Sequence, residues 1–204
     1  SRLKKSLRFF EIEKDIDEGK IYAYINSSEE KNFALKLIAS DKNFILTSRS
    51  DNYRDDDKNY NLILSEVRRN SSSKMIYHKS LSYYENIMEH RWAQDRGYDS
   101  ALFINEREEV CETSFANIFF VRNEEIFTPT ISSGLLKGTM RDYILELYKV
   151  KEDVISFKCI DNYDEAFISN SLMGVRNVSS INNVNFNKDE VTRLIQRNLK
   201  EFGF

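Results

Sequence analysis

Two side chains, Lys79 and Glu112, have the types and surroundings needed for chemistry on a carbonyl compound. Lys79 follows the β-like run 75–78 at the expected start of a helix, next to the aromatic residue Tyr83. An amine kept partly out of water loses its proton more readily and then attacks carbonyl carbons. Glu112 stands just before an apolar strand, where a carboxylate needs a cationic or protonated partner. Plainer interpretations stay open, because lysines at helix starts are mostly surface charges and a glutamate can cap a turn.

Two further segments offer the donors that hold a phosphate. Gly138, Thr139 and Met140 stand at the expected N-terminus of a helix, where backbone N–H groups bind anions. Residues 169–171, Ser-Asn-Ser, follow an expected strand and carry hydroxyl and amide donors. Either segment alone is ordinary as a cap or a turn. Together with a nucleophilic lysine and a carboxylate, they complete the groups that hold pyridoxal 5′-phosphate: a Schiff-base lysine, a partner for the pyridine nitrogen and a phosphate cup.

The elements around these residues indicate an α+β fold with two lobes, residues 1–73 and 74–204. Alternating and β-rich stretches predict strands, and apolar side chains at intervals of three and four residues predict helices. The expected strands cover residues 20–25, 32–38, 43–47, 62–67, 101–105, 117–121, 125–128 and 165–169, and the expected helices cover 1–10, 81–96, 141–149 and 188–202.

Some predictions concern single segments. The helix over 81–96 is expected to bury one face, formed by Leu81, Tyr84, Ile87, Met88 and Trp92, and to end at Gly97. Residues 122–124 predict the turn of a tight β-hairpin. The acidic segment 50–61 is expected to be a solvated loop, and the polar segment 70–73 a connection between the lobes.

Composition limits the class of protein. The 204 residues are 41% hydrophobic and 31% charged, as in one or two globular domains. Thirty Lys and Arg against 33 Asp and Glu leave a net charge of −3, which disfavours a nucleic-acid partner. We find no apolar run of the roughly 20 residues that span a bilayer and no export signal, so we expect a cytoplasmic protein without a membrane partner. Cys111 and Cys159 are expected to be buried free thiols, not metal ligands.

Beyond these patterns, the sequence resembles the class IV aminotransferase family, the fold-type IV pyridoxal-phosphate enzymes. The matching segments are HKSLSY at 78–83, ETSFANIFF at 112–120, FTP at 127–129, SGLLKGTMR at 133–141 and SNSLM at 169–173. They stand in the family order, and RLKKS at 2–6 resembles the family's arginine-bearing early helix. The resemblance covers nearly the whole chain. It implies the two-lobed fold-type IV architecture, with the start of the small N-terminal lobe missing.

The resemblance also implies a role for each matching residue. Lys79 would be the catalytic residue and form the Schiff base with pyridoxal 5′-phosphate, and Glu112 would bind the protonated pyridine nitrogen. Tyr84 would reach the phenolic oxygen of the cofactor, as a tyrosine does at this place in some members. The phosphate would be held by Arg2, by Thr139 and Met140 through backbone N–H groups, and by Ser171, with Asn170 beside it.

The family contains lyases and aminotransferases. Residues 138–141 and 169–173 look more like those of 4-amino-4-deoxychorismate lyases, which release 4-aminobenzoate and pyruvate. The alternatives are an aminotransferase for branched-chain or D-amino acids, and a non-catalytic remnant, against which the retained Lys79 and Glu112 argue. The resemblance implies a small-molecule amine substrate and a homodimer. Three arginines, Arg68, Arg69 and Arg176, could supply positive charge for a dicarboxylate, although such arginines are more often surface charges.

Overall fold

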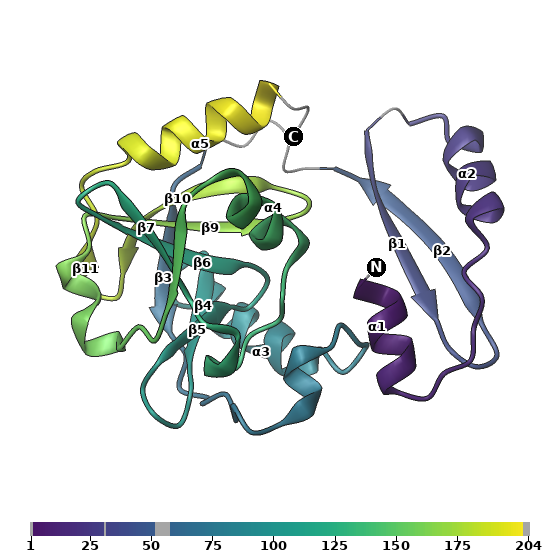
Figure 1. The fold of residues 1–204 in the computed structure, drawn as a ribbon, viewed down its shortest axis with the longest axis horizontal. Coiled ribbons are helices and arrows are strands. Elements are labelled where there is room, and N and C mark those ends of the chain that lie inside the picture. The colour runs from purple at the N-terminus through teal and green to yellow at the C-terminus, as the bar shows by residue number, and fades with distance from the viewer. Residues whose placement is uncertain (1, 31, 52–57, 202–204) are drawn as a thin grey trace. The chain divides into compact units, whose positions relative to one another are not determined.

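The chain divides into two compact units, Ser1–Asp56 and Asp57–Phe204. The computed structural model in Figure 1 describes residues 2–30, 32–51 and 58–201. The boundary expected after residue 73 lies inside the larger unit, because strand β3 (Tyr60–Leu64) pairs with strands of that unit. Half of the expected loop 50–61, residues 52–57, lies outside the described residues, whereas Ser50 ends a strand and residues 60–61 begin β3.

The smaller unit combines two helices with a β-hairpin. Its elements are α1 (Arg2–Phe9), α2 (Glu18–Ser27), β1 (Phe33–Ala39) and β2 (Phe44–Ser50). Strands β1 and β2 lie where the sequence predicts strands, and they pair antiparallel, from Phe33 opposite Ser50 to Ala39 opposite Phe44. The strand predicted over 20–25 is wrong, because this segment belongs to α2. Asp17 caps that helix by accepting a hydrogen bond from the backbone N–H of Lys20 at 3.0 Å.

The larger unit is built on a nine-stranded sheet. Its order is β11-β10-β3-β4-β5-β6-β7-β8, and β9 pairs with both β10 and β6, so that six strands form a closed ring. Together with the helices, this sheet confirms the predicted α+β class. Besides β3, its strands are β4 (Ser100–Ile104), β5 (Val110–Thr113), β6 (Asn117–Arg122), β7 (Glu125–Pro129), β8 (Val150–Asp153), β9 (Glu165–Asn170), β10 (Gly174–Ile181) and β11 (Val184–Asn185).

Helices cover this sheet. Helix α3 packs against β4, α4 against β9, and α5 against β9 and β10. Among the described residues, we find no helix that combines the length and the apolar character needed to cross a membrane. The helical segments of the larger unit are η1 (Lys74–Tyr77), α3 (Tyr84–Gln94), η2 (Ile131–Ser133), α4 (Thr139–Leu147), η3 (Phe157–Asn162) and α5 (Glu190–Glu201).

The core lies between β6, β9 and the two helices α4 and α5. Phe119 and Phe167 stack at its centre, with ring centroids 4.7 Å apart and planes 5° from parallel. The strand β6 is buried over residues 118–121, which explains why its sequence is an unbroken apolar run. The predicted hairpin is confirmed, since Asn123 and Glu124 both have positive φ, as a two-residue turn between β6 and β7 requires.

Helix α3 contradicts one prediction, because its apolar face points outward. Leu81 and Tyr84, just before and at the helix start, are 69% and 72% exposed. Ile87 and Met88 are exposed as well. The buried face instead carries Asn86, whose Nδ2 donates a hydrogen bond to the carbonyl oxygen of Ser114 at 2.9 Å. The helix ends at Gln94, slightly before the predicted end, and Gly97 adopts φ of 80° two residues after the C-cap Asp95.

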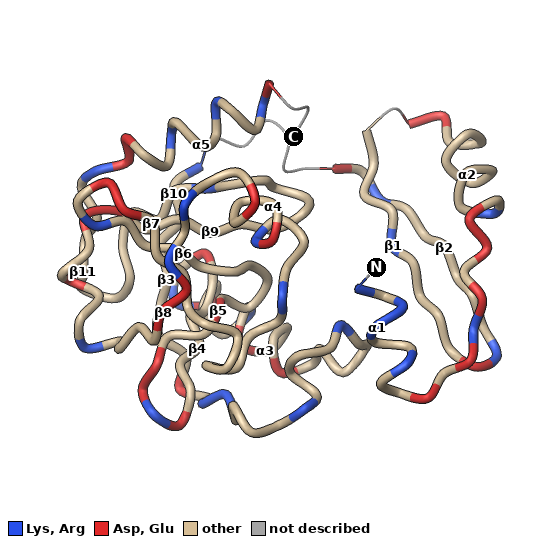
Figure 2. The backbone as a smooth tube through the Cα atoms, viewed as in Figure 1, with Lys and Arg blue, Asp and Glu red and all other residues tan. Residues whose placement is uncertain are grey.

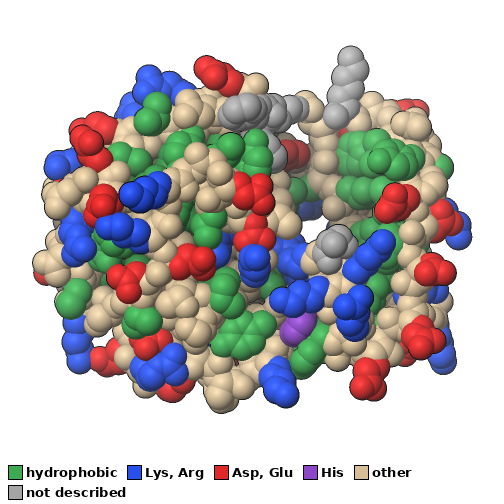
Figure 3. Space-filling view, in the orientation of Figure 1, with side chains coloured by type: hydrophobic (Ala, Val, Ile, Leu, Met, Phe, Trp, Pro, Cys, Tyr) green, Lys and Arg blue, Asp and Glu red, His purple; other side chains and the backbone are tan. Residues whose placement is uncertain are grey.

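Charged side chains of both signs are spread along the larger unit. The tube in Figure 2 shows Lys and Arg interspersed with Asp and Glu on it. On the face seen in Figure 3, side chains of both signs lie among apolar ones. On the larger unit, this distribution agrees with the small net charge of the chain.

Candidate active site

Lys79 lies in the loop between η1 and α3 and lines a cavity of about 210 Å³. The preceding β-like run is in fact a 3₁₀ turn, η1, followed by its cap His78. The ammonium of Lys79 lies over the ring of Tyr83, with Nζ 4.2 Å from the ring centroid. The hydroxyl of Tyr83 donates a hydrogen bond to the carbonyl oxygen of Ser114 at 2.8 Å. An aromatic side chain that is itself anchored therefore contacts the amine.

Glu112, on β5, lines the same cavity. The structure thus brings together the two side chains that the sequence singles out first. Oε2 of Glu112 accepts hydrogen bonds from the backbone N–H of Leu136 at 3.2 Å and from Nδ2 of Asn117 at 3.5 Å. Its Oε1 lies 3.9 Å from Nη2 of Arg69. Arg69 is therefore a cationic partner of the kind that a poorly exposed carboxylate requires.

Asn117, the first residue of β6, connects Glu112 to the start of α4. Besides contacting Glu112, its Nδ2 donates a hydrogen bond to the carbonyl oxygen of Leu136 at 2.9 Å. Its Oδ1 occupies the space beside Gly138, the N-cap of α4, where an added Cβ would lie only 2.0 Å away. The missing side chain at position 138 lets the start of α4 approach Asn117.

The Ser-Asn-Ser segment reaches the same end of the sheet, because Ser169 on β9 pairs with Asn117 on β6. Oδ1 of Asn170 accepts hydrogen bonds from the backbone N–H groups of Leu172 and Met173, both at 2.9 Å. Its Nδ2 donates to the carbonyl oxygen of Phe115 at 3.3 Å. The side chain of Asn170 therefore shapes the turn that carries Ser171.

The start of α4 offers backbone groups more than side chains. Thr139 is exposed as the first residue of the helix, and the side chain of Met140 is buried in the core. This leaves the backbone N–H groups of the first turn, which lack partners within a helix, as the groups that could hold an anion.

Two further expected residues stand in helices. Arg2 belongs to α1 of the smaller unit. Tyr84 begins α3 as an exposed residue, and its neighbour Tyr83 lines the cavity. The cofactor roles of Arg2 and Tyr84 stay predictions.

Other expectations about single side chains need correction. Cys159 is exposed in η3, whereas Cys111 is buried on β5 as predicted, and burial raises the pKa of its thiol far above the ordinary value. The surface interpretation is wrong for Arg69 and Arg176, which are both buried. It fits Arg68, which is exposed and donates a hydrogen bond to the carbonyl oxygen of Ser65.

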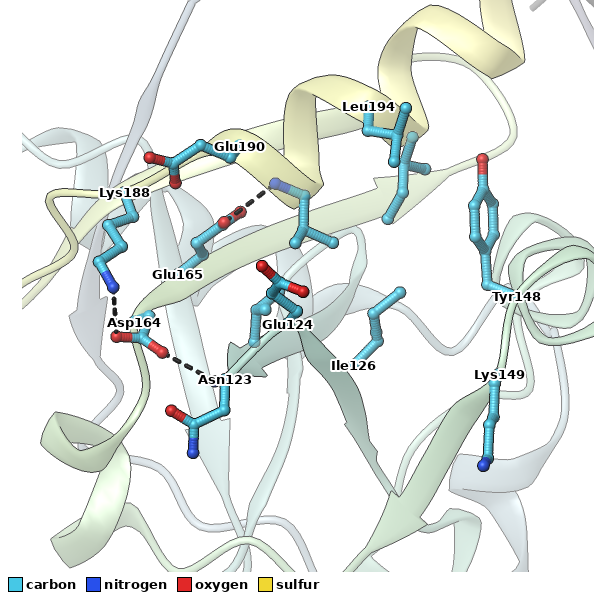
Figure 4. Close-up of a pocket in the computed structure, with 13 residues that line it drawn as sticks. Asn123, Glu124, Ile126, Tyr148, Lys149, Asp164, Glu165, Lys188, Glu190 and Leu194 are labelled. Carbon is cyan, nitrogen blue, oxygen red and sulfur yellow. Dashed lines mark hydrogen bonds and ion pairs between the residues drawn. The ribbon is translucent and has the colours of Figure 1, made fainter.

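A larger hollow, of about 950 Å³, lies at the opposite end of β6, between the β6–β7 turn and α5 (Figure 4). Several of its polar groups bind one another. Lys188 pairs with Asp164 at 3.0 Å, and Glu165 accepts the backbone N–H groups of Val191 and Thr192 at the start of α5. These contacts give the carboxylates a structural role. Lys79 and Glu112 line the smaller cavity, not this one.

Sequence reasoning assigned no role to Asn86 and Asn117. Asn117 had a usable signal, because a short hairpin after Glu112 places the two residues opposite each other on β5 and β6. Asn86 had none, since it lies on the helix face that the apolar spacing predicts to be exposed.

The comparisons with known proteins now identify the family. The family model for class IV amino-transferases matches residues 1–181, so the chain belongs to the class IV aminotransferase family. The chain is 29% identical over 155 residues to a probable branched-chain-amino-acid aminotransferase of Rickettsia bellii, covering 71% of this chain and 52% of that protein. It is 29% identical over 143 residues to an aminodeoxychorismate lyase of Vibrio harveyi, covering 66% and 53%. The chain spans about half the length of these curated relatives.

Solved structures agree with the family. A Legionella pneumophila protein named as a candidate 4-amino-4-deoxychorismate lyase superposes with a TM-score of 0.87 and 25% identity, covering 98% of this chain and 82% of that one. The pyridoxal-phosphate form of a branched-chain aminotransferase from Thermobaculum terrenum gives 0.84 and 22%, covering 98% and 75%. The predicted fold-type IV architecture is therefore confirmed.

Proposed function

We propose that this chain is the cofactor-binding part of a pyridoxal 5′-phosphate-dependent lyase that converts 4-amino-4-deoxychorismate to 4-aminobenzoate and pyruvate. The observation that carries the cofactor is that Lys79 and Glu112 line one cavity. The lyase reaction is supported by the resemblance of loops 138–141 and 169–173 and by the name of the Vibrio harveyi relative. A branched-chain aminotransferase is the second candidate, because other relatives carry that name.

The residues present fit the cofactor. The amine of Lys79 suits its carbonyl group, and the carboxylate of Glu112 suits its protonated pyridine nitrogen. The backbone N–H groups at the start of α4 suit its phosphate, and Asn117 ties this helix start to Glu112. In addition, the buried Oγ of Ser169, at the same end of the sheet, has no hydrogen-bond partner among the described residues. This end of the sheet thus offers an amine for the carbonyl group, a carboxylate for the pyridine nitrogen, and N–H and hydroxyl donors for the phosphate.

Bound pyridoxal phosphate supplies an electron-accepting ring, which makes a proton on the carbon next to the substrate amine removable. The side chains of the protein would hold the cofactor and move the protons. Lys79 would hold the cofactor until the substrate amine takes its place, and its freed Nζ would then act as the base. It would take the proton from the ring carbon that bears the amine and help to protonate the departing enolpyruvyl group. Glu112 would keep the pyridine nitrogen protonated, and Tyr83 would keep Nζ beside the cavity.

The first test is an absorbance spectrum of the protein with added pyridoxal 5′-phosphate. We expect a band near the visible edge that disappears in Lys79→Ala and persists in Lys74→Ala, a matched control at an exposed lysine of the same segment. A band that persists in Lys79→Ala, or no band at all, would refute the cofactor site and leave the non-catalytic remnant as the explanation.

A second test separates the two enzyme reactions. With 4-amino-4-deoxychorismate alone, the lyase forms 4-aminobenzoate and pyruvate and needs no acceptor. An aminotransferase instead needs a 2-oxo acid and forms a new amino acid. Turnover of an amino acid with 2-oxoglutarate, without aminobenzoate formation, would replace the lyase by the aminotransferase.

We also propose that the protein forms a homodimer, as the family resemblance implies. The exposed apolar side chains on and before α3, which include Leu81, Ile87 and Met88, support an interface, because apolar side chains gathered on one surface segment often mark a binding site. Light scattering after gel filtration tests this. We expect Ile87→Asp to yield a monomer, whereas Leu194→Asp, at an exposed apolar residue of α5, leaves the dimer intact. A wild-type monomer, or a dimer that survives Ile87→Asp, would contradict this interface.

A further inference from the structure

We propose that Arg69 is a positioning residue for Glu112 and thereby determines how tightly the cofactor ring is held. This inference rests on the proposed cofactor site, and it gives Arg69 a role different from the one that the sequence offered, a positive charge for a dicarboxylate. Its basis is the set of contacts that fix Arg69 beside Glu112.

The guanidinium of Arg69 is clamped on several sides. Nη1 donates a hydrogen bond to Oε1 of Glu85 at 2.5 Å, and Nη2 donates to Oδ1 of Asn86 at 2.8 Å. The guanidinium also lies over the ring of Phe103, 3.7 Å from the centroid. A planar cation with two directed hydrogen bonds and an aromatic face below it has little freedom to move. These contacts therefore hold the positive charge of Arg69 in one position.

This fixed charge faces Glu112 at the cavity. Nη2 of Arg69 lies 3.9 Å from Oε1 of Glu112, and both residues line the same cavity. The two side chains are only 10% and 12% exposed, so water screens the interaction weakly. The other acidic partner, Glu85, is 52% exposed and can be solvated without Arg69. Glu112 is therefore the carboxylate that depends most on the arginine.

The contacts of Arg69 also connect the segment that carries Lys79 with the carboxylate of Glu112. Glu85 and Asn86 stand in the first turn of α3, directly after the loop that carries Lys79. Nδ2 of Asn86 and the hydroxyl of Tyr83 both donate to the carbonyl oxygen of Ser114. The helix start that follows the lysine thus holds the arginine that faces the carboxylate. Arg69 acts through Glu112, because its polar contacts at the cavity are with the side chains of Glu85, Asn86 and Glu112.

The dissociation constant of pyridoxal 5′-phosphate, measured by titration of its absorbance, tests this through a double-mutant cycle. The variants are Arg69→Gln, Glu112→Gln and the double variant, with Arg68→Gln as the matched control at an exposed neighbouring arginine. We expect Arg69→Gln to raise the dissociation constant about tenfold and to shift the absorbance maximum of the bound cofactor. Arg68→Gln is expected to change neither quantity. The double variant is expected to bind no more weakly than Glu112→Gln alone, since Arg69 has nothing left to position.

Losses that multiply in the double variant would overturn the proposal, because a merely structural role weakens binding independently of Glu112. An unchanged affinity in Arg69→Gln would overturn it as well. If Arg69→Gln does not fold, the same cycle is run with Arg69→Lys, which keeps the charge but not the two-pronged contact, and multiplying losses again refute the proposal. A wild-type protein without the Lys79-dependent band would instead refute the cofactor site itself, on which this inference rests.

Discussion

The close contact between Gly138 and Asn117 makes the start of α4 unusually sensitive to one methyl group. In Gly138→Ala, the new Cβ would lie 2.0 Å from Oδ1 and 3.3 Å from Cγ of Asn117. The first distance is far inside van der Waals contact, so one of the two residues must move. The backbone conformation of Gly138, with φ of −76° and ψ of 146°, is open to alanine, and the clash alone therefore causes the effect.

Either movement has a cost that can be estimated. If Asn117 moves, its hydrogen bond to the carbonyl oxygen of Leu136 at 2.9 Å is lost in a poorly exposed place, at about 1–3 kcal/mol. If α4 moves instead, the tightly packed core shifts with it, at a similar cost of about 1–3 kcal/mol. Alanine is also a poorer N-cap than glycine. We therefore expect the free energy of unfolding of the larger unit to fall by about 2–4 kcal/mol.

The fluorescence of Trp92, the only tryptophan, reports urea unfolding of the larger unit. We expect Gly138→Ala to lower the urea midpoint and also to weaken the binding of pyridoxal 5′-phosphate, because the displaced groups adjoin Glu112. Asn117→Ala removes the clashing amide, so the double variant should lose less stability than the two single losses added together. Lys137→Ala, at the exposed neighbour, is the control. A Gly138→Ala protein within about 0.5 kcal/mol of wild type, or additive losses, would refute the reasoning.

Three further predictions concern other parts of the chain. In the native protein at pH 8, an aromatic disulfide reagent should modify Cys159 but not Cys111, whose thiol pKa is raised by burial, and both should react after unfolding. Asp17→Ala should destabilise α2 by about 0.5–2 kcal/mol through loss of its cap, which faster amide hydrogen exchange in that helix would reveal. The pKa of Glu106 is lowered to about 2, chiefly by the hydroxyl of Ser71, and Ser71→Ala should raise that pKa toward its ordinary value in an NMR titration.

The sign of the last effect follows from linkage. A carboxyl whose pKa is lower in the folded protein stabilises it above the ordinary pKa, and this stabilisation is lost as pH falls toward about 2. Ser71→Ala should therefore reduce the stability of the protein at neutral pH relative to its stability in acid. The control for Ser71→Ala is Ser73→Ala, because Ser73 makes no side-chain cap hydrogen bond. The control for Asp17→Ala is Asp15→Ala, because the N-cap of α2 is Asp17. A Glu106 pKa unchanged in Ser71→Ala would contradict the assigned cause.

The sequence by itself determined the elements whose signals are local. The hairpin of β6 and β7 follows from an apolar run, a two-residue turn and a second apolar run. All three features lie within one short segment of the sequence. The pair Lys79 and Glu112 could be singled out because each residue stands beside a recognisable apolar element. Their motifs also identified the family, which the comparison over residues 1–181 confirms.

Only the tertiary structure decided the outcomes that depend on distant partners. The helix over 20–25 is a local exception, because the residue that caps it, Asp17, stands just before it in the sequence. Helix α3 has the predicted periodicity but the opposite orientation, because Asn86 finds hydrogen-bond partners at Ser114 and Arg69, both remote in sequence. The pattern of one helix gives the spacing of its buried face, whereas the partners on other strands decide which face is buried. For the same reason, the pairing of β9 with β6 and β10, and the placing of Arg69 beside Glu112, could not be derived from the sequence.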